Sequence, residues 1–143
     1  MNNYHVYWWH ALHHDFIKVG YGLMPEMRMA EYAERYGLTP APSSLCGQVM
    51  RSKLAAIYAE ESLHRLLPRH NVAQFEWDAA IGDSEARELF DLGNLEYSVV
   101  DRLIRQLLSE IAASLPYDWE LVTENNARRM AFSHFQLSGG PGS

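Results

Sequence analysis

The sequence predicts an α/β fold: a small antiparallel three-stranded sheet flanked by helices, with a helical C-terminal extension. Three observations lead to this prediction. Two short runs of aromatic and β-branched residues near the start are joined by a polar connector, as in a β-hairpin. Apolar residues recur at helical spacing in several later stretches. No apolar run approaches the roughly 20 residues of a membrane-spanning helix, so we expect no membrane segment.

The hairpin and the helix after it have clear local signals. Residues 4–9 and 16–21 contain the side chains that favour strands, and residues 11–15 form the connector. A helix is expected to begin at Pro25, because proline suits a first helical position. Gly37 is expected to end that helix.

Two further elements and a short helix are expected in the middle of the chain. Residues 44–50 are expected to form the third strand, and residues 52–67 a second helix that Pro68 ends. Asp83 has the side chain of an N-cap, and we expect a short helix from there through Phe90. The middle of the chain therefore predicts one strand and two helices.

The C-terminal region is expected to be mainly helical. Asn94 is expected to cap a longer helix that ends near Pro116, and residues 117–136 to add a strand and a short helix. The sequence thus divides into three parts: residues 4–92 as a core, residues 93–136 as a helical extension, and residues 137–143 as a disordered tail.

Composition points to one packed domain inside the cell. The chain has 143 residues, of which 48% are hydrophobic, which suits a single core. Cys46 is the only cysteine, so no internal disulfide can form. The N-terminus lacks the basic start and apolar stretch of a signal peptide. We therefore expect a cytoplasmic protein.

The net charge of −6 is unevenly distributed along the chain. Residues 1–70 contain seven Lys/Arg and six Asp/Glu, whereas residues 71–143 contain five and twelve. An acidic protein is not an obvious partner for nucleic acid. The acidity belongs to the second half, however, so the first half can still present a modestly basic face.

An ordered set of residues in the first half carries the candidate chemistry. In order they are Val6-Tyr7, Lys18-Val19-Gly20, Arg28, Glu60 with Leu63-His64, and Glu76-Trp77. This order resembles the motifs of the GIY-YIG nuclease superfamily, and most of all its divergent branch found in phage proteins. The resemblance covers roughly residues 4–92. It implies a metal-dependent endonuclease acting on nucleic acid, with DNA as the first expectation.

The chemistry of phosphodiester cleavage explains why such residues would be needed. A divalent ion can activate a water, neutralise the transition state and help the alkoxide leave. Mg²⁺ or Mn²⁺ prefers oxygen ligands, so one glutamate can be enough to hold the ion. The resemblance implies Glu60 as the metal ligand and Arg28 as the phosphate contact, because an arginine fork matches phosphate oxygens. His64, one turn after Glu60, is included as a proton carrier.

The group that assists the attacking water is left open among Tyr7, Lys18 and Tyr21. A phenol or an amine can act as a general base when its pKa is lowered. The resemblance places Tyr7 in this role, and Lys18 stands where the second motif usually has tyrosine. The simpler interpretation is that the aromatic side chains pack the hairpin and that Lys18 faces solvent.

The second helix gives an independent test of Glu60. At 100° per residue, Glu60 falls between Ala56 and Leu63 in the apolar stripe, while Glu61 falls beside Arg65 on the side facing water. A carboxylate on the covered face needs a partner, because burying it alone is costly. A metal ion and a salt bridge to a nearby Arg or Lys are equally good partners at this point.

Two other groups of residues have competing interpretations. Arg28 has the i, i+3 spacing for a surface pair with Glu31, which by spacing alone is the favoured interpretation. A hairpin loop with several histidines has the residue types of a zinc site, although no matching ligands recur elsewhere. The residues of that loop are His10, His13, His14 and Asp15.

The long C-terminal helix has an apolar stripe with alternating spacings of three and four residues. The stripe consists of Tyr97, Val100, Ile104, Leu107 and Ile111. We expect it to pack on the domain's own core, with a homodimer contact through residues 94–115 as the second choice. The alternative to a nuclease is a catalytically inactive module on the same fold that binds a protein or nucleic acid. A phage origin is implied only by analogy.

Overall fold

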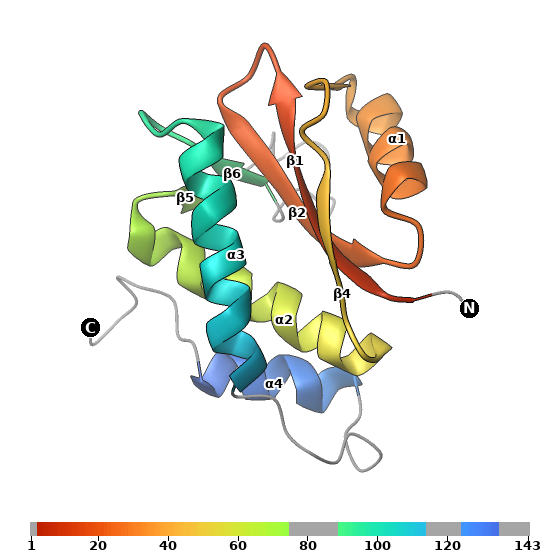
Figure 1. Ribbon diagram of the computed structural model, residues 1–143, viewed down its shortest axis with the longest axis vertical. Coiled ribbons are helices and arrows are strands. Elements are labelled where there is room, and N and C mark those ends of the chain that lie inside the picture. Colours follow the sequence, from red (N-terminus) through yellow and green to blue (C-terminus); the bar gives the residue numbers. More distant parts are fainter. Residues whose placement is uncertain (1–2, 75–88, 114–123, 135–143) are drawn as a thin grey trace.

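A computed structural model of the chain describes residues 3–74, 89–113 and 124–134. These residues form one antiparallel sheet with helices on both faces, which confirms the expected α/β class (Figure 1). None of the helices within these ranges is long and apolar enough to cross a membrane. The elements are β1 (His5–Leu12), β2 (Phe16–Gly22), α1 (Pro25–Tyr36), β3 (Thr39–Pro40), β4 (Cys46–Val49), α2 (Lys53–Leu66), β5 (Ala73–Gln74), β6 (Leu89–Asp91), α3 (Tyr97–Ala113) and α4 (Glu124–His134).

The sheet has six strands in the described parts of the chain, where three were expected. The expected strands are β1, β2 and β4, and the hairpin register runs from His5 opposite Gly22 to His10 opposite Ile17. Among the extra strands, β3 contains two residues, and the described parts of β5 and β6 contain two and three residues. Stretches of this length do not show the alternation by which a strand is recognised in a sequence.

The two faces of the hairpin pack into two separate cores. In β1, Val6 and Trp8 point toward α2 and α3, while Tyr7 and Trp9 point toward α1. This division follows from the two-residue period of a strand. Tyr32 of α1 packs on the second core, and its ring lies edge-on to Trp9 with the centroids 6.1 Å apart.

The ends of the first two helices follow their local signals. Pro25 begins α1, and Gly37 caps it in the left-handed conformation, with a φ of 67°. The hydroxyl of Ser52 accepts a hydrogen bond from the Ala55 N–H and caps α2. Beyond α2 the chain continues as a 3₁₀ turn, Leu67–His70, in which Pro68 occupies an early position.

A short helix was expected to run through Phe90. This prediction is wrong at its C-terminal end, because Leu89–Asp91 forms strand β6. This strand pairs with β2 and supplies hydrogen bonds to its outer edge. Leu89 packs in the core beside α1, and Phe90 packs in the core beside α2. Only an extended chain puts two consecutive side chains on opposite faces in this way.

The long helix α3 begins at Tyr97, two residues later than an N-cap at Asn94 would place it. Asn94 lies instead in a turn with Gly93, whose φ of 61° is left-handed. The first helical carbonyl is that of Glu96, which accepts bonds from the N–H groups of Val99 and Val100. Asn94 therefore belongs to a turn before the helix and is not the N-cap of α3.

The apolar stripe of α3 is covered by the chain's own core. The buried residues on this helix are Val100, Ile104, Leu107, Leu108 and Ile111. They pack in the same core as Val6 and Trp8 of β1. The favoured expectation of packing within the domain is confirmed, and the homodimer hypothesis loses the surface on which it was based.

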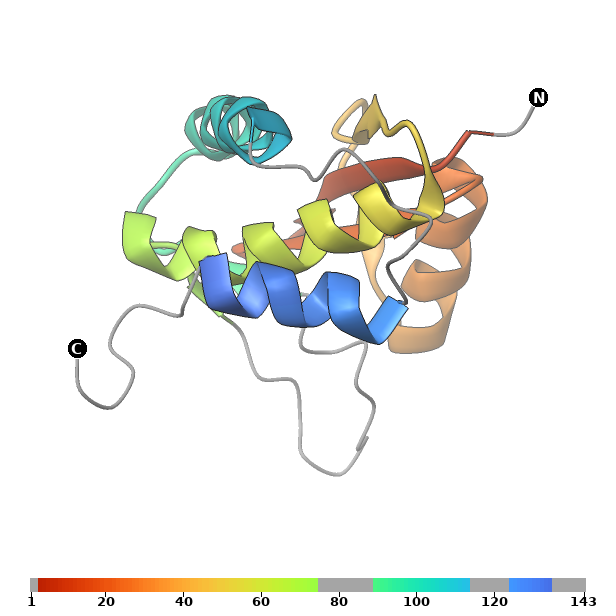
Figure 2. The same ribbon diagram turned by 90° about the horizontal axis from the view of Figure 1, so that it is seen from below.

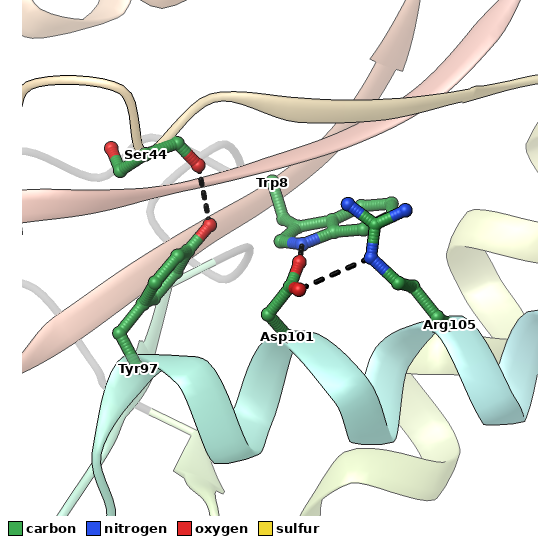
Figure 3. A network of polar contacts seen from close by, with 5 residues as sticks. All are labelled: Trp8, Ser44, Tyr97, Asp101 and Arg105. Carbon is green, nitrogen blue, oxygen red and sulfur yellow. Dashed lines mark hydrogen bonds and ion pairs between the residues drawn. The ribbon is translucent and has the colours of Figure 1, made fainter.

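A polar network fixes α3 against the sheet (Figure 3). The indole Nε1 of Trp8 donates to Asp101 at 2.7 Å, and Arg105 Nε donates to the same carboxylate at 3.1 Å. Tyr97 donates from its hydroxyl to the Ser44 carbonyl at 2.6 Å. Burial pushes the pKa of Asp101 up, but the bonds from Trp8 and Arg105 hold it below its usual value. This network joins β1, the loop before β4 and α3.

Helix α4 lies alongside α2 (Figure 2). Lys53 pairs with Glu124 at 2.7 Å, and the Arg65 guanidinium lies 4.4 Å from the centre of the Phe132 ring. These two contacts show that the helices run in the same direction. The short helix expected within residues 117–136 is confirmed by α4.

The position of α4 overturns one expectation about α2. Glu61 pairs with Arg65 at 2.7 Å, as the spacing suggested, but the two side chains are only 17% and 19% exposed. The expectation that they face water is wrong, because α4 packs beside α2 and Phe132 contacts Arg65.

Four expectations concern residues outside the described ranges. They are the motif Glu76-Trp77, the cap at Asp83, the strand within residues 117–123 and the tail at residues 137–143.

Candidate functional site

Three of the residues singled out from the sequence line one small pocket between the hairpin and α1. Tyr7 comes from β1, Lys18 from β2 and Arg28 from α1. The pocket has a volume of about 60 Å³ and is completed by Glu31, Tyr32 and Arg35. Residues that are up to 21 positions apart in the chain therefore meet because the hairpin register and α1 bring them together.

Lys18 is buried, contrary to the expectation that a strand lysine faces solvent. It is 2% exposed, and its ammonium lies 4.7 Å from the centre of the Tyr32 ring. The ammonium also lies 3.5 Å from the Val19 carbonyl oxygen. A cation over an aromatic face is stabilised by the ring quadrupole. The lysine is thus held inside the protein, at the edge of the pocket.

The packing around position 20 leaves no space for a side chain, which explains the glycine there. A Cβ atom at this position would lie 2.8 Å from the Tyr7 hydroxyl oxygen, 2.9 Å from its Cζ and 3.2 Å from the Lys18 ammonium nitrogen. The phenol and the ammonium therefore both lie over the glycine. The Lys18-Val19-Gly20 motif supplies one cation and the space that lets Tyr7 approach it.

Glu60 is buried on α2, as the helical spacing predicted. It is 2% exposed, and its Oε2 atom has no hydrogen-bond partner within the described structure. Burial raises the pKa of Glu60 to about 7, while the positive charges of Lys18 and Arg128 oppose this rise. A buried oxygen without a donor is costly to a fold, and this one is available to a ligand.

His64 connects the α2 side of the molecule with the pocket. Its Nε2 donates to the Val19 carbonyl at 3.3 Å, the same oxygen that lies near the Lys18 ammonium. Burial, helped by the charge of Lys18, lowers the pKa of His64 to about 3. The imidazole is therefore neutral near pH 7, which suits a metal ligand better than an acid that must first carry an extra proton.

The edge of β2 explains how residues on two faces of the sheet come together. Helices α1 and α2 lie on opposite sides of the hairpin (Figure 1). The described residues of β6 pair with β2 from Phe16 to Lys18. At Val19, the next residue of β2, the carbonyl oxygen accepts a hydrogen bond from His64 of α2. The candidate site therefore extends from the pocket around this edge to Glu60.

A divalent ion fits the residues on the α2 side of this edge. Ligand atoms of Glu60, Glu61 and His64 all lie within 4.8 Å of one another. Glu60 offers its unpaired oxygen, and the neutral His64 offers the ring nitrogen that does not bond to Val19. Carboxylate oxygens suit Mg²⁺ and Mn²⁺, and ligating histidines commonly donate their other nitrogen to a carbonyl. These three residues could hold a metal ion, and the identity of the ion as Mg²⁺ or Mn²⁺ stays a prediction.

Comparisons of the chain with protein-family models, with curated proteins and with solved structures give no match. The relation to the GIY-YIG superfamily therefore stays a prediction that depends on the motif residues themselves.

Tyr21 lies apart from the other residues of the motif. It is opposite Val6 in the hairpin and packs on the core beside α2, whereas Lys18 and Gly20 belong to the other face. It does not line the pocket. Of the three groups considered for assisting the attacking water, Tyr7 and Lys18 line the same pocket, whereas Tyr21 does not.

Two arginines near the site were not anticipated. Arg35 lines the pocket from α1, and Arg128 of α4 acts on the charge of Glu60. The spacing of seven residues from Arg28 to Arg35 could have indicated a common helix face. No signal in the sequence relates Arg128 to Glu60, because the two residues are 68 positions apart and meet only when α4 packs on α2.

The competing interpretations of Arg28 and of the histidine loop have different outcomes. Arg28 does pair with Glu31, with 3.7 Å between the charged atoms, while it also lines the pocket. In the loop, His10 Nε2 donates to the His14 carbonyl at 3.0 Å, and the His10 ring stacks on Tyr97. The group of Glu60, Glu61 and His64 is the one that the described residues offer to a metal, and the loop does not provide another.

Proposed function

We propose that the chain is a metal-dependent endonuclease of the GIY-YIG type that hydrolyses phosphodiester bonds of nucleic acid, with DNA as the first substrate to test. The observation that carries this proposal is the gathering of Tyr7, Lys18 and Arg28 in one pocket, where the charge of Lys18 also acts on the buried carboxyl of Glu60. Local packing alone does not require cations, a phenol and a carboxylate from four elements to meet.

The pocket residues have distinct roles in the proposed reaction. Arg28 lines the pocket with a side chain that is 49% exposed, so its guanidinium can contact two oxygens of a phosphate. Lys18 is a fixed positive charge beside the Tyr7 hydroxyl, and both groups lie over Gly20. Tyr7 is the group that we assign to accept a proton from the attacking water, because its hydroxyl lies in the pocket beside the Lys18 ammonium.

Glu60 and His64 would hold the divalent ion. When bound, Mg²⁺ or Mn²⁺ would supply positive charge to the developing transition state. Glu60 must lose its proton to act as a ligand, and Lys18 and Arg128 favour that loss. His64 is neutral and kept in one orientation by its bond to Val19, so it can serve as a ligand but not as an imidazolium acid.

The nuclease proposal is tested by cleavage assays on plasmid, single-stranded DNA and RNA, with Mg²⁺, Mn²⁺ or EDTA. We expect wild-type cleavage that needs metal. Glu60→Ala and Arg28→Ala should each lower the rate at least about a hundredfold, because charge stabilisation at a phosphate is worth several kcal/mol. Glu110→Gln on the exposed side of α3 is the matched control and should cleave normally.

Metal binding needs a readout that does not depend on cleavage. Mn²⁺ should broaden the ring signals of His64 in NMR spectra of the wild type, and this broadening should be absent in Glu60→Ala. Lack of cleavage on all substrates together with lack of broadening, in a protein shown to be folded, would reject the proposal.

The second candidate function is an inactive binding module on the same fold. It is favoured by the interaction of Glu60 with Lys18, which gives the buried carboxylate a structural partner without any metal. In that case no substrate should be cleaved, and Mn²⁺ should leave the His64 signals unchanged. These two measurements separate the module from the nuclease.

A further inference from the structure

We propose that Arg35 is the second arginine of an oxyanion pocket that holds a single phosphate group, the one that reacts. The inference rests on the proposed function only in assigning this phosphate to a nucleic-acid strand. The pocket itself is defined by its lining residues, which include Lys18, Arg28 and Arg35.

The position of Arg35 on α1 supports this role. Arg28, Glu31, Tyr32 and Arg35 are spaced i, i+3, i+4 and i+7, which places them on one face of the helix. This face meets Lys18 of β2, because the Lys18 ammonium lies over the Tyr32 ring. The two arginines approach the pocket from positions two turns apart, about 10 Å along the helix axis. A ligand between them can be contacted from both ends.

The charge of the pocket fits an anion. Three cationic side chains line it against one carboxylate, that of Glu31. One cation, Lys18, is buried, so water screens its charge less than the charge of a surface lysine. The Glu31 carboxylate lies 3.7 Å from Arg28 and takes up part of that charge. The remaining imbalance favours a ligand that carries negative charge.

The size of the pocket selects a small ligand. Its volume of about 60 Å³ is far below the several hundred Å³ of pockets that enclose whole drug-sized molecules. A tetrahedral phosphate group suits this space, whereas a base or a complete nucleotide does not. Tyr7 also lines this pocket, so the group that we assign to accept the proton from water lies beside the bound phosphate.

The direct experiment measures binding of inorganic phosphate by NMR titration at constant ionic strength. Arg35→Gln should weaken binding about tenfold, since a hydrogen bond between charged groups is lost. Arg35→Lys should recover part of the affinity, because it keeps the charge and loses the fork. Glu31→Gln should bind phosphate more tightly than the wild type, because it removes the opposing charge. Arg102→Gln, an exposed arginine of α3, is the matched control.

The outcomes separate this inference from the nuclease proposal. Phosphate binding that depends on Arg35, without cleavage of any nucleic acid, would keep the pocket and reject the nuclease. Cleavage with unchanged kcat/KM in Arg35→Gln, together with unchanged phosphate affinity, would reject the role of Arg35 and keep the nuclease. No phosphate binding by the wild type would also overturn the inference. Arg35 is exposed, and an unchanged melting temperature will show that each variant is folded.

Discussion

Glu60 shows how the surroundings of one residue change its chemistry. In water a glutamate carboxyl has a pKa near 4.5, whereas burial on α2 raises the pKa of Glu60 to about 7. Folding without a metal therefore favours the protonated form of this group. A divalent ion would favour the ionised form, so metal binding and proton release are expected to be coupled.

The pH dependence of stability follows from this shift. The folded protein binds more protons at Glu60 than the unfolded chain between pH 4.5 and about 7. The stability contribution of this group is therefore lost as the pH rises through that window. We expect Glu60→Gln, which lacks the titration, to gain about 3 kcal/mol over the wild type between pH 4.5 and pH 8. Urea unfolding of both proteins across this range measures the difference.

His64 acts in the opposite direction and serves as an internal reference. Its pKa is lowered by burial from 6.5 to about 3, so its contribution is present above pH 6.5 and falls as the pH drops toward 3. The wild type and Glu60→Gln both contain His64, so its contribution cancels when their free energies of unfolding are subtracted. Mg²⁺ at pH 8 should restore part of the loss in the wild type alone. If the free energies of unfolding of the wild type and Glu60→Gln changed in parallel with pH, Glu60 would titrate as an exposed carboxyl does, and the prediction would be wrong.

Gly20 supplies a second prediction at the scale of one residue. Gly20→Ala places a methyl group 2.8 Å from the Tyr7 hydroxyl oxygen, and Tyr7 is too buried to move away easily. We expect a loss of about 1–3 kcal/mol in the free energy of unfolding, together with reduced activity. Gly22→Ala is the control in the same strand, because its methyl group meets only the Arg28 side chain, with Cγ at 3.4 Å and Cδ at 4.0 Å. Equal stability of the two variants would contradict the proposed contact.

At the scale of elements, a partly buried carboxylate joins α3 to the sheet. The carboxylate of Asp101 accepts from Trp8 of β1 and from Arg105 of its own helix (Figure 3). The Trp8 ring is fully buried, so its N–H has no access to water if this acceptor is removed. The helix is therefore positioned by a specific bond as well as by its apolar stripe.

Substitutions at Asp101 test this connection. Asp101→Ala leaves the Trp8 N–H without a partner and should lower the free energy of unfolding by about 1–3 kcal/mol. Asp101→Asn keeps an acceptor oxygen and should cost less. Arg105→Ala removes an exposed pair and should cost no more than about 0.5 kcal/mol. Urea unfolding gives the ranking, and a loss in Arg105→Ala as large as that in Asp101→Ala would refute the central role of the indole bond.

At the scale of the whole molecule, the two C-terminal helices share a core with the hairpin. Ile104 of α3 and Ala131 of α4 pack in the same cluster as Trp8 of β1 and Leu63 of α2. The residues expected to form a nuclease core, 4–92, thus bury one face of their sheet partly against residues that follow them. Arg128 of α4 also lies close enough to act on Glu60.

A fragment containing only residues 1–92 should therefore fail to fold. It would expose the apolar face that α3 and α4 cover, and burial of such surface is the main favourable contribution to folding. Far-UV circular dichroism and NMR spectra of the fragment and the full chain would measure this. A dispersed NMR spectrum with a cooperative unfolding transition for the fragment would show that residues 4–92 are an independent domain.

Features that depend on near neighbours in the chain could be predicted from the amino-acid sequence alone. The hairpin, the start of α1 at Pro25, its end at Gly37 and the burial of Glu60 all follow from patterns within a few turns or strand residues. These signals are local because strand and helix periods fix which side chains share a face. The ordered motif also identified Tyr7, Lys18 and Arg28, which line one pocket.

Which helix and sheet faces pack against one another is known from the tertiary structure alone. The two-residue and three-residue strands, the burial of Lys18, the separation of Tyr21 from the pocket and the approach of Arg128 to Glu60 all depend on contacts between distant segments. A single sequence contains the period of each element but not the pairing between elements. Elements pair so that their apolar faces are buried together, and this depends on the complete fold and not on one segment.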